Sequence, residues 1–243
     1  MTAQPTIADI ATAIWVTWPG EESIPTPAFT LRRSGDDSRR SRAATANRAV
    51  SDTDIAEAAQ TMQSWGQPAL FWVPSDQPDL DAQLERLGYR DHDHSIYYGA
   101  PTSALAQHPP PPVTCFEIWE PLAIMADIWS ETGTSPGRQE VMARAACPKT
   151  AIFGRMDAQP AGAAYVGTND GLALLHALAT LPQHRRKGLG AHMMAQAGIW
   201  AARQGCDWLA LAVGRDNGPA CALYASLGMV PVGSYHYRSL AHA

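Results

Sequence analysis

The stretch LPQHRRKGLGAHMMAQAGIW, residues 181–200, decides the fold of this chain. It follows the apolar segment LALLHALATL (172–181), which is typical of a β-strand, and from Leu189 to Trp200 apolar residues recur at helical spacing. A glycine-containing turn between a strand and a helix leaves backbone N–H groups without partners at the positive end of the helix dipole. The turn is therefore predicted to bind an anion.

The composition of the turn indicates which anion it binds. Gly188 and Gly190 let the backbone approach a ligand closely, and the cations of Arg185, Arg186 and Lys187 add positive charge around it. A basic helix start on a solvated surface is the alternative, although cations are unfavourable at a helix N-terminus. The nucleotide-binding motifs GxxxxGK[ST] and GxGxxG are both absent. The anion is therefore expected to be a pyrophosphate held in a different kind of phosphate-binding site.

The rest of the second half predicts alternating helices and strands in the order ααβββαβαβ. Ser135 and Pro136 are typical of a helix start, and Gly133, Gly205 and Gly228 of helix ends. The expected helices are 120–133, 135–147, one from 189 to Gly205, and 218–228, and the expected strands are 150–157, 161–168, 172–181, 207–213 and 230–238.

Two motifs in this half resemble the GNAT N-acetyltransferase superfamily. The first is its acyl-CoA signature [Q/R]-x-x-G-x-[G/A], matched by Arg185, Gly188 and Gly190, with Pro182 before it. The second is N-x-x-A-x-x-L-Y-x-x-x-G-[F/Y/M], which is matched by Asn217, Ala220, Leu223, Tyr224, Gly228 and Met229. The resemblance covers about residues 115–243. It implies an α/β (α+β) fold whose mixed, mostly antiparallel sheet is splayed at the acyl-CoA site and flanked by helices.

The resemblance also implies how acetyl-CoA is bound as a co-substrate. The end of the strand before the turn would bond the pantetheine arm, the turn would hold the pyrophosphate, and Asn217 and Tyr224 would lie near the thioester. The implied binding residues are Leu178, Ala179, Thr180, Arg185, Arg186, Lys187, Gly188, Leu189, Gly190, Asn217 and Tyr224.

The proton of the attacking amine needs an acceptor, because an alkylammonium with a pKa near ~10 must first lose its proton. Many family members use a glutamate on the strand before the turn, and this strand has none. Its one titratable residue is His176, which is expected to share a face with Leu178 because it lies two residues earlier. His176 is therefore a candidate base or proton relay, with a water relay or a hydrogen-bonded structural histidine as alternatives.

Tyr224 is the candidate general acid. Its phenol would donate a proton to the departing CoA thiolate, a group of similar acidity. The alternative is an aromatic helix residue that packs beside Leu223 and Leu227.

The first half is expected to be a smaller, degenerate GNAT-like domain, as in tandem members of the superfamily. Residues 80–99 align with 218–238, with Leu84 over Leu223 and Glu85 over Tyr224, and this half has no glycine-rich anion turn. We expect it to occupy residues 1–103 and to wall the substrate cleft. A Pro-rich linker, 104–114, would join it to the catalytic domain, 115–243.

Local patterns in the first half predict a hairpin over residues 28–50, a capped helix from Ser51 and a strand at 68–73. Six arginines crowd residues 31–48, and they are expected to lie on a solvated face, with docking of the adenosine phosphate or an acidic substrate as alternatives. His92 and His94 would share a strand face, but two ligands without a third make no metal site, so no metal is expected.

Composition limits the partners. No apolar run reaches the ~20 residues of a membrane helix, no secretion signal stands at the start, and the four cysteines are scattered, so a cytoplasmic protein without membrane contact is expected. A net charge of −5 disfavours nucleic acid and weakly favours a cationic substrate. A homodimer is compatible with the sequence.

The leading hypothesis for function is an acetyl-CoA-dependent N-acetyltransferase, an acyltransferase that acts on a primary amine of a small molecule or protein. A non-catalytic acyl-CoA-binding or sensing module is an alternative, since the usual glutamate is missing. An acyltransferase with another acyl donor or acceptor is a third. The acceptor itself is not indicated by the sequence.

Overall fold

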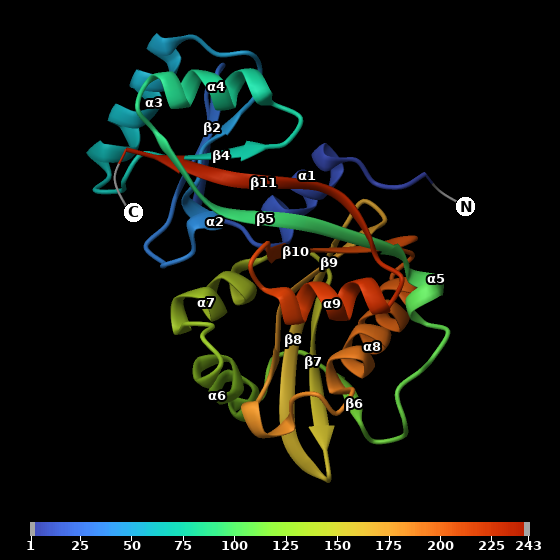
Figure 1. Ribbon diagram of the computed structural model, residues 1–243. Helices are drawn as coiled ribbons and strands as arrows, with labels where there is room; N and C mark the ends of the chain where they lie inside the picture. Colours follow the sequence, from blue (N-terminus) through green and yellow to red (C-terminus); the bar gives the residue numbers. More distant parts are fainter. Residues whose placement is uncertain (1–2, 241–243) are drawn as a thin grey trace.

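The computed structural model describes residues 3–240 and contains two sheets (Figure 1). The large sheet has eight strands in the order β4-β11-β5-β10-β9-β8-β7-β6, and a second sheet has the order β1-β2-β3. The strands are β1 (Glu22–Pro25), β2 (Phe29–Arg33), β3 (Thr45–Ala46), β4 (Leu70–Pro74), β5 (Arg90–Pro101), β6 (Cys115–Ile118), β7 (Lys149–Met156), β8 (Gln159–Asn169), β9 (Leu172–Thr180), β10 (Trp208–Gly214) and β11 (Val230–Ser239).

Nine α-helices surround the sheets in the part of the chain that the structure describes. They are α1 (Ile7–Thr17), α2 (Arg39–Arg42), α3 (Asp52–Ser64), α4 (Pro78–Arg86), α5 (Thr102–Leu105), α6 (Ala123–Glu131), α7 (Pro136–Arg144), α8 (Leu189–Arg203) and α9 (Gly218–Ser226). In the large sheet only β9 and β10 pair in parallel, and all its other pairs are antiparallel. The predicted mixed, mostly antiparallel sheet flanked by helices is thus confirmed.

Local sequence determines where the principal helices begin. Ser51 caps α3 by accepting from the amide of Asp54, and the Asp54 carboxylate bonds the amide of Ser51 in return. The Ser135 hydroxyl caps α7, and Pro136 occupies its first turn. Both starts agree with the sequence predictions. Helix α1 was not predicted, although Thr6 and Asp9 form the same kind of capping box.

The two halves of the chain exchange strands within the large sheet. β5, from the first half, lies between β10 and β11, so that Tyr98 is opposite Leu211 on one side and Pro231 on the other. β11, from the second half, lies in turn between β5 and β4, with Tyr237 opposite Trp72. Each half therefore completes the sheet of the other.

The hydrogen bonds that close α4 and α9 have the same form. The Tyr89 amide donates to the Leu84 carbonyl at 3.0 Å, and the Met229 amide donates to the Tyr224 carbonyl at 3.1 Å. When the two helices are compared by these bonds, Leu84 corresponds to Tyr224, one residue away from the expected alignment with Leu223. Because α3, α6 and α8 end with the same kind of bond, the repeat between the halves stays a prediction.

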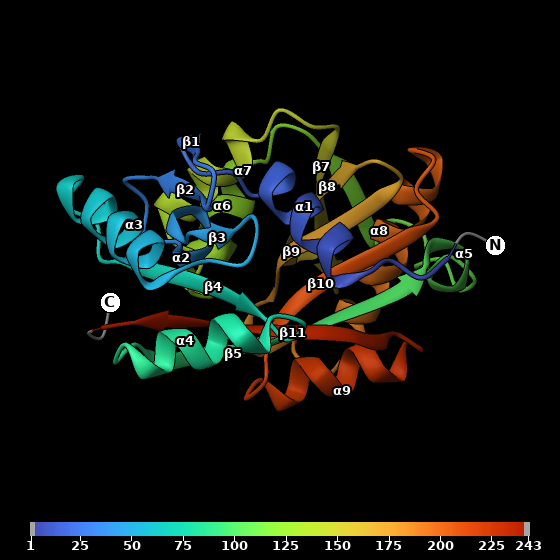
Figure 2. The same cartoon turned by 90° about the horizontal axis from the view of Figure 1, so that it is seen from above.

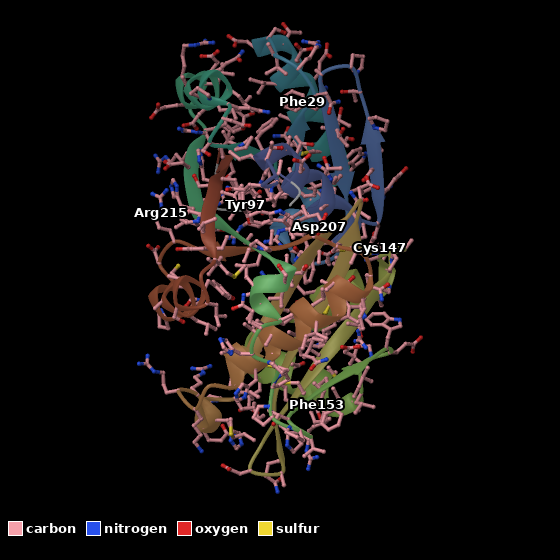
Figure 3. The ribbon with its side chains drawn as sticks, turned by 90° about the vertical axis from the view of Figure 1, so that its right-hand side faces the viewer. Phe29, Tyr97, Cys147, Phe153, Asp207 and Arg215 are labelled. Atoms are coloured by element: carbon pink, nitrogen blue, oxygen red, sulfur yellow. The ribbon has the colours of Figure 1, made fainter. Side chains whose placement is uncertain are left out.

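The sheet separates two groups of helices. In Figure 2, α1, α2 and α3 lie on one side of the β4-β11-β5 layer, and α4 and α9 lie on the other. Figure 3 shows Phe29 toward one end of the molecule, Phe153 toward the other and Tyr97 between them. Phe29 and Phe153 belong to separate apolar cores, and the fully buried Tyr97 lies in a core shared by α1, β5, β10 and β11.

Most predicted elements of the second half appear within three residues of their expected bounds. Strand β6 was missed, and it pairs with β7 at the edge of the sheet. The predicted hairpin at 28–50 is a pairing of β2 with β3 interrupted by α2. No helix among residues 3–240 is long and apolar enough to cross a membrane.

Candidate active site

A cleft opens where β9 and β10 part. The two strands pair only from Leu172–Leu175 to Trp208–Leu211, and beyond these residues their facing edges have no mutual hydrogen bonds. The cleft has a volume of about 630 Å³. Its lining includes His176 and Leu178 from β9, Asn217 and Tyr224 from the α9 segment, and Trp18, Arg40 and Tyr237 from the opposite side of the sheet. Four predicted site residues are thus brought together.

The end of β9 presents free backbone groups to this opening. The Leu181 amide donates to the Ala161 carbonyl of β8, so the backbone groups of Thr180 and Leu178 point the other way. Ala179 is opposite Ala163 of β8. The backbone groups of Leu178 and the Thr180 amide therefore lie on the unpaired edge, whereas the Thr180 carbonyl accepts from Arg185 Nε and the backbone groups of Ala179 face β8.

The predicted anion turn lies at the N-terminus of α8. Gly188 caps the helix with φ +87°, Arg186 has φ +63°, and no side chain caps the helix. Among residues 3–240, nothing accepts a hydrogen bond from the amides of Arg186, Lys187, Gly188, Leu189 and Gly190. These groups are available to an anion, as the sequence predicts.

Two cationic side chains of the turn already have partners. Arg185 donates through Nε to the Thr180 carbonyl at 3.1 Å, and Lys187 lies 3.6 Å from the Asp157 carboxylate. Gly190 lies close to α9, since a Cβ there would lie 3.0 Å from Leu223 Cδ2 and would require that side chain to shift. The turn does not line the cleft itself but follows directly after the strand that does.

A β-bulge at Ala177 divides β9. Ala177 has φ +48°, the register with β8 shifts here, and Trp129 Nε1 donates to its carbonyl at 2.9 Å. His176 packs on Trp18 with ring centroids 5.0 Å apart, whereas Leu178 packs against the core beneath α8. The expectation that His176 and Leu178 share a face was wrong, because the bulge inserts an extra residue into the alternation.

Both ring nitrogens of His176 are occupied. Arg40 carries only donors, so its Nη1, 3.1 Å away, donates to Nδ1 of the imidazole. Nε2 therefore carries the proton and donates to the Thr17 hydroxyl at 2.8 Å, which in turn donates to the Ala13 carbonyl. Burial lowers the pKa of His176 well below its usual 6.5, and the charge of Arg40 lowers it further.

This arrangement argues against His176 as the proton acceptor. A base needs a free lone pair near the acceptor amine, and the one lone pair of this imidazole is bound to a cation. Protonation would place a second positive charge 3.1 Å from Arg40. His176 remains a neutral group that orients Arg40.

Tyr224 and Asn217 lie at the other side of the cleft. Tyr224 is 6% exposed and packs beside Tyr98, with ring centroids 5.9 Å apart and ring planes tilted by 46°. Burial raises the pKa of Tyr224 to about 12, and Cys221 adds to the shift, so the phenol keeps its proton at neutral pH. The Asn217 carboxamide caps α9 by accepting from the Ala220 amide at 3.2 Å.

The pair His92 and His94 does not form a metal site. A second bulge, at Asp93 with φ +54°, places the two side chains on opposite faces of β5. His92 stacks on Tyr237, and His94 stacks on His236. The expected shared face was wrong for the same reason as in β9. Among the described residues, no group of three or more metal-ligating side chains comes together.

Comparison with known proteins identifies the second half. Residues 117–229 match the family model described as the acetyltransferase (GNAT) family. The match covers just under half of the chain, so the second half is similar to GNAT acetyltransferases. The uncharacterized N-acetyltransferase YobR of Bacillus subtilis is 32% identical over 73 residues, which are 30% of this chain and 30% of that protein. The match therefore spans under a third of the relative's length.

Solved structures of the GNAT fold match nearly the whole chain. A GCN5-related N-acetyltransferase from Kribbella flavida superposes with a TM-score of 0.76 at 19% identity, covering 99% of this chain and 98% of its own. A tandem GNAT protein from the clavulanic acid biosynthesis pathway gives 0.64 at 16% identity, over 89% and 80%. The fold is therefore that of GNAT acetyltransferases over both halves.

Sequence reasoning predicted that the first half walls the cleft, but it did not predict which residues do so. Trp18 follows α1, which was not predicted, and Arg40 belongs to the segment that was expected to be a solvated face. Arg32, in the same segment, is 3% exposed and lies 3.7 Å over the Trp15 ring. The solvated-face interpretation was wrong for these two arginines, because the first half folds them inward.

Proposed function

We propose that this protein transfers the acetyl group of acetyl-CoA to a primary amine by direct attack on the thioester. The single observation that carries the proposal is the continuity of the strand edge, cleft and amide turn. The free edge of β9 leads from the opening beside Tyr224 to the unpaired amides at the start of α8. An extended acyl-CoA has its acyl end and its pyrophosphate at opposite ends of such a path.

The residues that would hold acetyl-CoA fit its chemistry. Leu178 and the amide of Thr180 would offer backbone groups to the pantetheine arm, and the amides from Arg186 to Gly190 would offer donors to the pyrophosphate. Ala179, Arg185 and Asn217 would border the same path. Bound acetyl-CoA supplies an activated acetyl group.

Tyr224 would act as the general acid. Its pKa of about 12 keeps the hydroxyl protonated, and no described residue hydrogen-bonds this hydroxyl, so the proton is free to be donated into the cleft. General acid catalysis of this kind contributes about 10²- to 10⁴-fold in rate.

The proton of the amine would leave through water. His176 has no lone pair to offer, and β9 carries no carboxylate. A cleft of about 630 Å³ has room for ordered water beside a substrate. A water relay is therefore the proton acceptor that we propose in place of His176.

The first half would serve as a degenerate GNAT-like domain that walls the cleft. By the hydrogen bonds that close α4 and α9, its counterpart of Tyr224 is Leu84, which cannot donate a proton, and its Arg40 and Trp18 line the cleft of the second half. We divide the chain at 104–114, between α5 and β6, although β5 and β11 cross that division in space.

Release of CoA thiol tests the proposal. The purified protein is incubated with acetyl-CoA and a panel of primary amines, and we expect amine-dependent thiol release that falls strongly in Tyr224→Phe. Binding of acetyl-CoA without turnover of any amine would favour a non-catalytic acyl-CoA-binding module. Faster turnover of a longer acyl-CoA would favour the third alternative, another acyl donor.

A further inference from the structure

Arg40 places a positive charge in the cleft without a carboxylate partner. Its Nη1 bonds the neutral His176 ring at 3.1 Å, and its Nη2 bonds the Tyr235 hydroxyl at 3.2 Å. Its Nε is buried with no hydrogen-bond partner, and no carboxylate of residues 3–240 lies within 4 Å of the guanidinium. A buried cation normally has an anionic partner, because removing a charge from water is costly.

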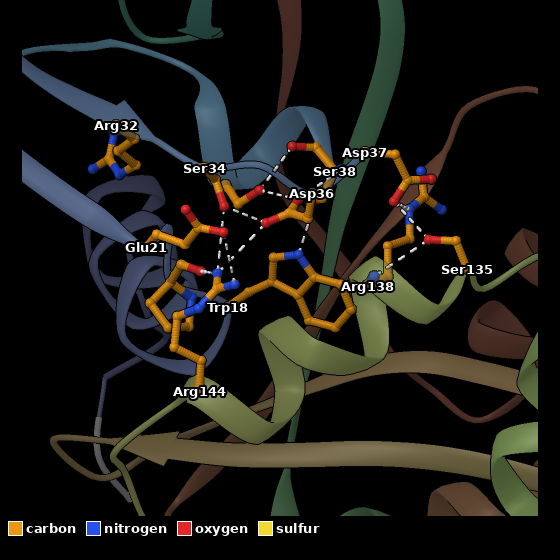
Figure 4. A network of polar contacts seen from close by, with 12 residues as sticks. Trp18, Glu21, Arg32, Ser34, Asp36, Asp37, Ser38, Ser135, Arg138 and Arg144 are labelled. Atoms are coloured by element: carbon orange, nitrogen blue, oxygen red, sulfur yellow. Dashed lines mark hydrogen bonds and ion pairs between the residues drawn. The ribbon is translucent and has the colours of Figure 1, made fainter. Parts of the chain in front are cut away.

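Arg40 is held in place before any ligand binds. Figure 4 shows the network around the segment that leads into α2. The buried Asp36 carboxylate accepts from the Ser38 amide at 2.8 Å and the Ser41 hydroxyl at 2.5 Å, and Trp18 Nε1 donates to the Ser38 hydroxyl at 2.9 Å. A rigid cation loses little conformational entropy when an anion binds to it.

The charged side chains that line the cleft are Arg39, Arg40, Arg138 and Arg215, together with Asp93 and Asp216. Arg39 pairs with Asp93 at 2.5 Å, and Arg138 has its nearest carboxylate, Asp37, at 4.0 Å. Arg138 lines the cleft from α7, beside Arg40. The lining therefore carries more positive than negative charge, which favours a substrate with an anionic group. The weak expectation of a cationic substrate, drawn from the net charge of the chain, stays a prediction.

An acceptor amine arrives mostly as an ammonium ion, which Arg40 repels. A carboxylate on the same molecule reverses the sign of this interaction and matches the donor geometry of a guanidinium. We propose that the acceptor is a primary amine that also carries a carboxylate, as α-amino acids do, and that Arg40 binds that carboxylate. His176 is then a positioning residue, since it fixes the guanidinium through Nδ1.

This inference rests on the proposed acetyl transfer, and matched substrates test it. Each pair consists of an amino acid and the amine that lacks its carboxylate, for example phenylalanine and phenethylamine. Steady-state thiol release with saturating acetyl-CoA gives kcat/KM for each. We expect the carboxylate-bearing member to be preferred by about 10- to 100-fold, the effect of one charge-assisted hydrogen bond.

Variants assign the preference to Arg40. Arg40→Gln should abolish the preference while KM for acetyl-CoA stays unchanged, and Arg33→Gln, which alters an exposed arginine of the same segment, should retain it. His176→Asn should raise KM for the amino acid and leave kcat for the plain amine unchanged. Thermal melting of each variant checks that it folds.

Equal kcat/KM for both members of every pair in the wild-type protein overturns the inference, and this result needs no variant. Calorimetric titration with the same pairs, without acetyl-CoA, separates the two proposals. Binding of the amino acid but not the amine, without any turnover, would uphold the carboxylate site and refute the transferase. Equal turnover of the amines with and without the carboxylate would uphold the transferase and refute the carboxylate site.

Discussion

Lowering the pH from 7.5 to 5 should destabilise the protein through His176. Burial and the charge of Arg40 hold the pKa of this imidazole well below 6.5, so the folded protein excludes a proton that the unfolded chain binds. Stability is therefore fully present above the unfolded pKa of about 6.5 and is lost as the pH falls below it. Each pH unit between 6.5 and the lowered pKa of the folded protein costs about 1.4 kcal/mol, so the loss between pH 7.5 and pH 5 is at most about 2 kcal/mol.

Urea unfolding at the two pH values measures this loss. His176→Asn keeps an acceptor for Arg40 but cannot titrate, so its free energy of unfolding should fall by up to about 2 kcal/mol less than that of the wild-type protein. His108→Asn, at an exposed position, should behave like the wild type. If the free energy of unfolding of His176→Asn changes with pH as much as that of the wild-type protein, His176 is not the neutral group hydrogen-bonded to Arg40 and Thr17 that the structure indicates.

Three further substitutions probe the site and the sheet. Tyr224→Phe should lower kcat by about 100-fold or more with little change in melting temperature, and undiminished turnover would remove Tyr224 from the chemistry. Gly188→Ala, at φ +87°, should cost about 1 kcal/mol in stability and raise Kd for acetyl-CoA, and unchanged affinity would count against the turn. Gly162→Ala would bring a Cβ within 2.7 Å of both the Ala179 carbonyl and Met193 Cε, so unfolding should become easier by about 1–3 kcal/mol; an unaffected urea midpoint would contradict this packing.

Local patterns predicted the second half well because its elements carry local signals. Ser135 caps its helix, and Gly205 and Gly228 end theirs with left-handed φ. The anion turn is equally local, since strand, glycines and helix follow one another in the chain. Features that depend on neighbours in sequence were therefore accessible.

Features that depend on pairing between distant segments of the chain could not be predicted from local patterns. The regular alternation of side chains along a strand predicted that His176 and Leu178 share a face. The bulge at Ala177 places them on opposite faces, and nothing in the sequence indicates that this alanine has φ +48°. The insertion of β5 between β10 and β11 joins segments more than a hundred residues apart. The inward position of Arg40 follows from that assembly, since charge pattern alone favours a solvated face.

Calorimetric titration with acetyl-CoA tests most directly whether the turn at Arg185–Gly190 holds the pyrophosphate of an acyl-CoA. Saturable binding with a Kd below about 1 mM, weakened by Gly188→Ala and competed by CoA, is the predicted result. Absence of binding heat and of competition at millimolar acetyl-CoA, in protein that melts cooperatively, would contradict it.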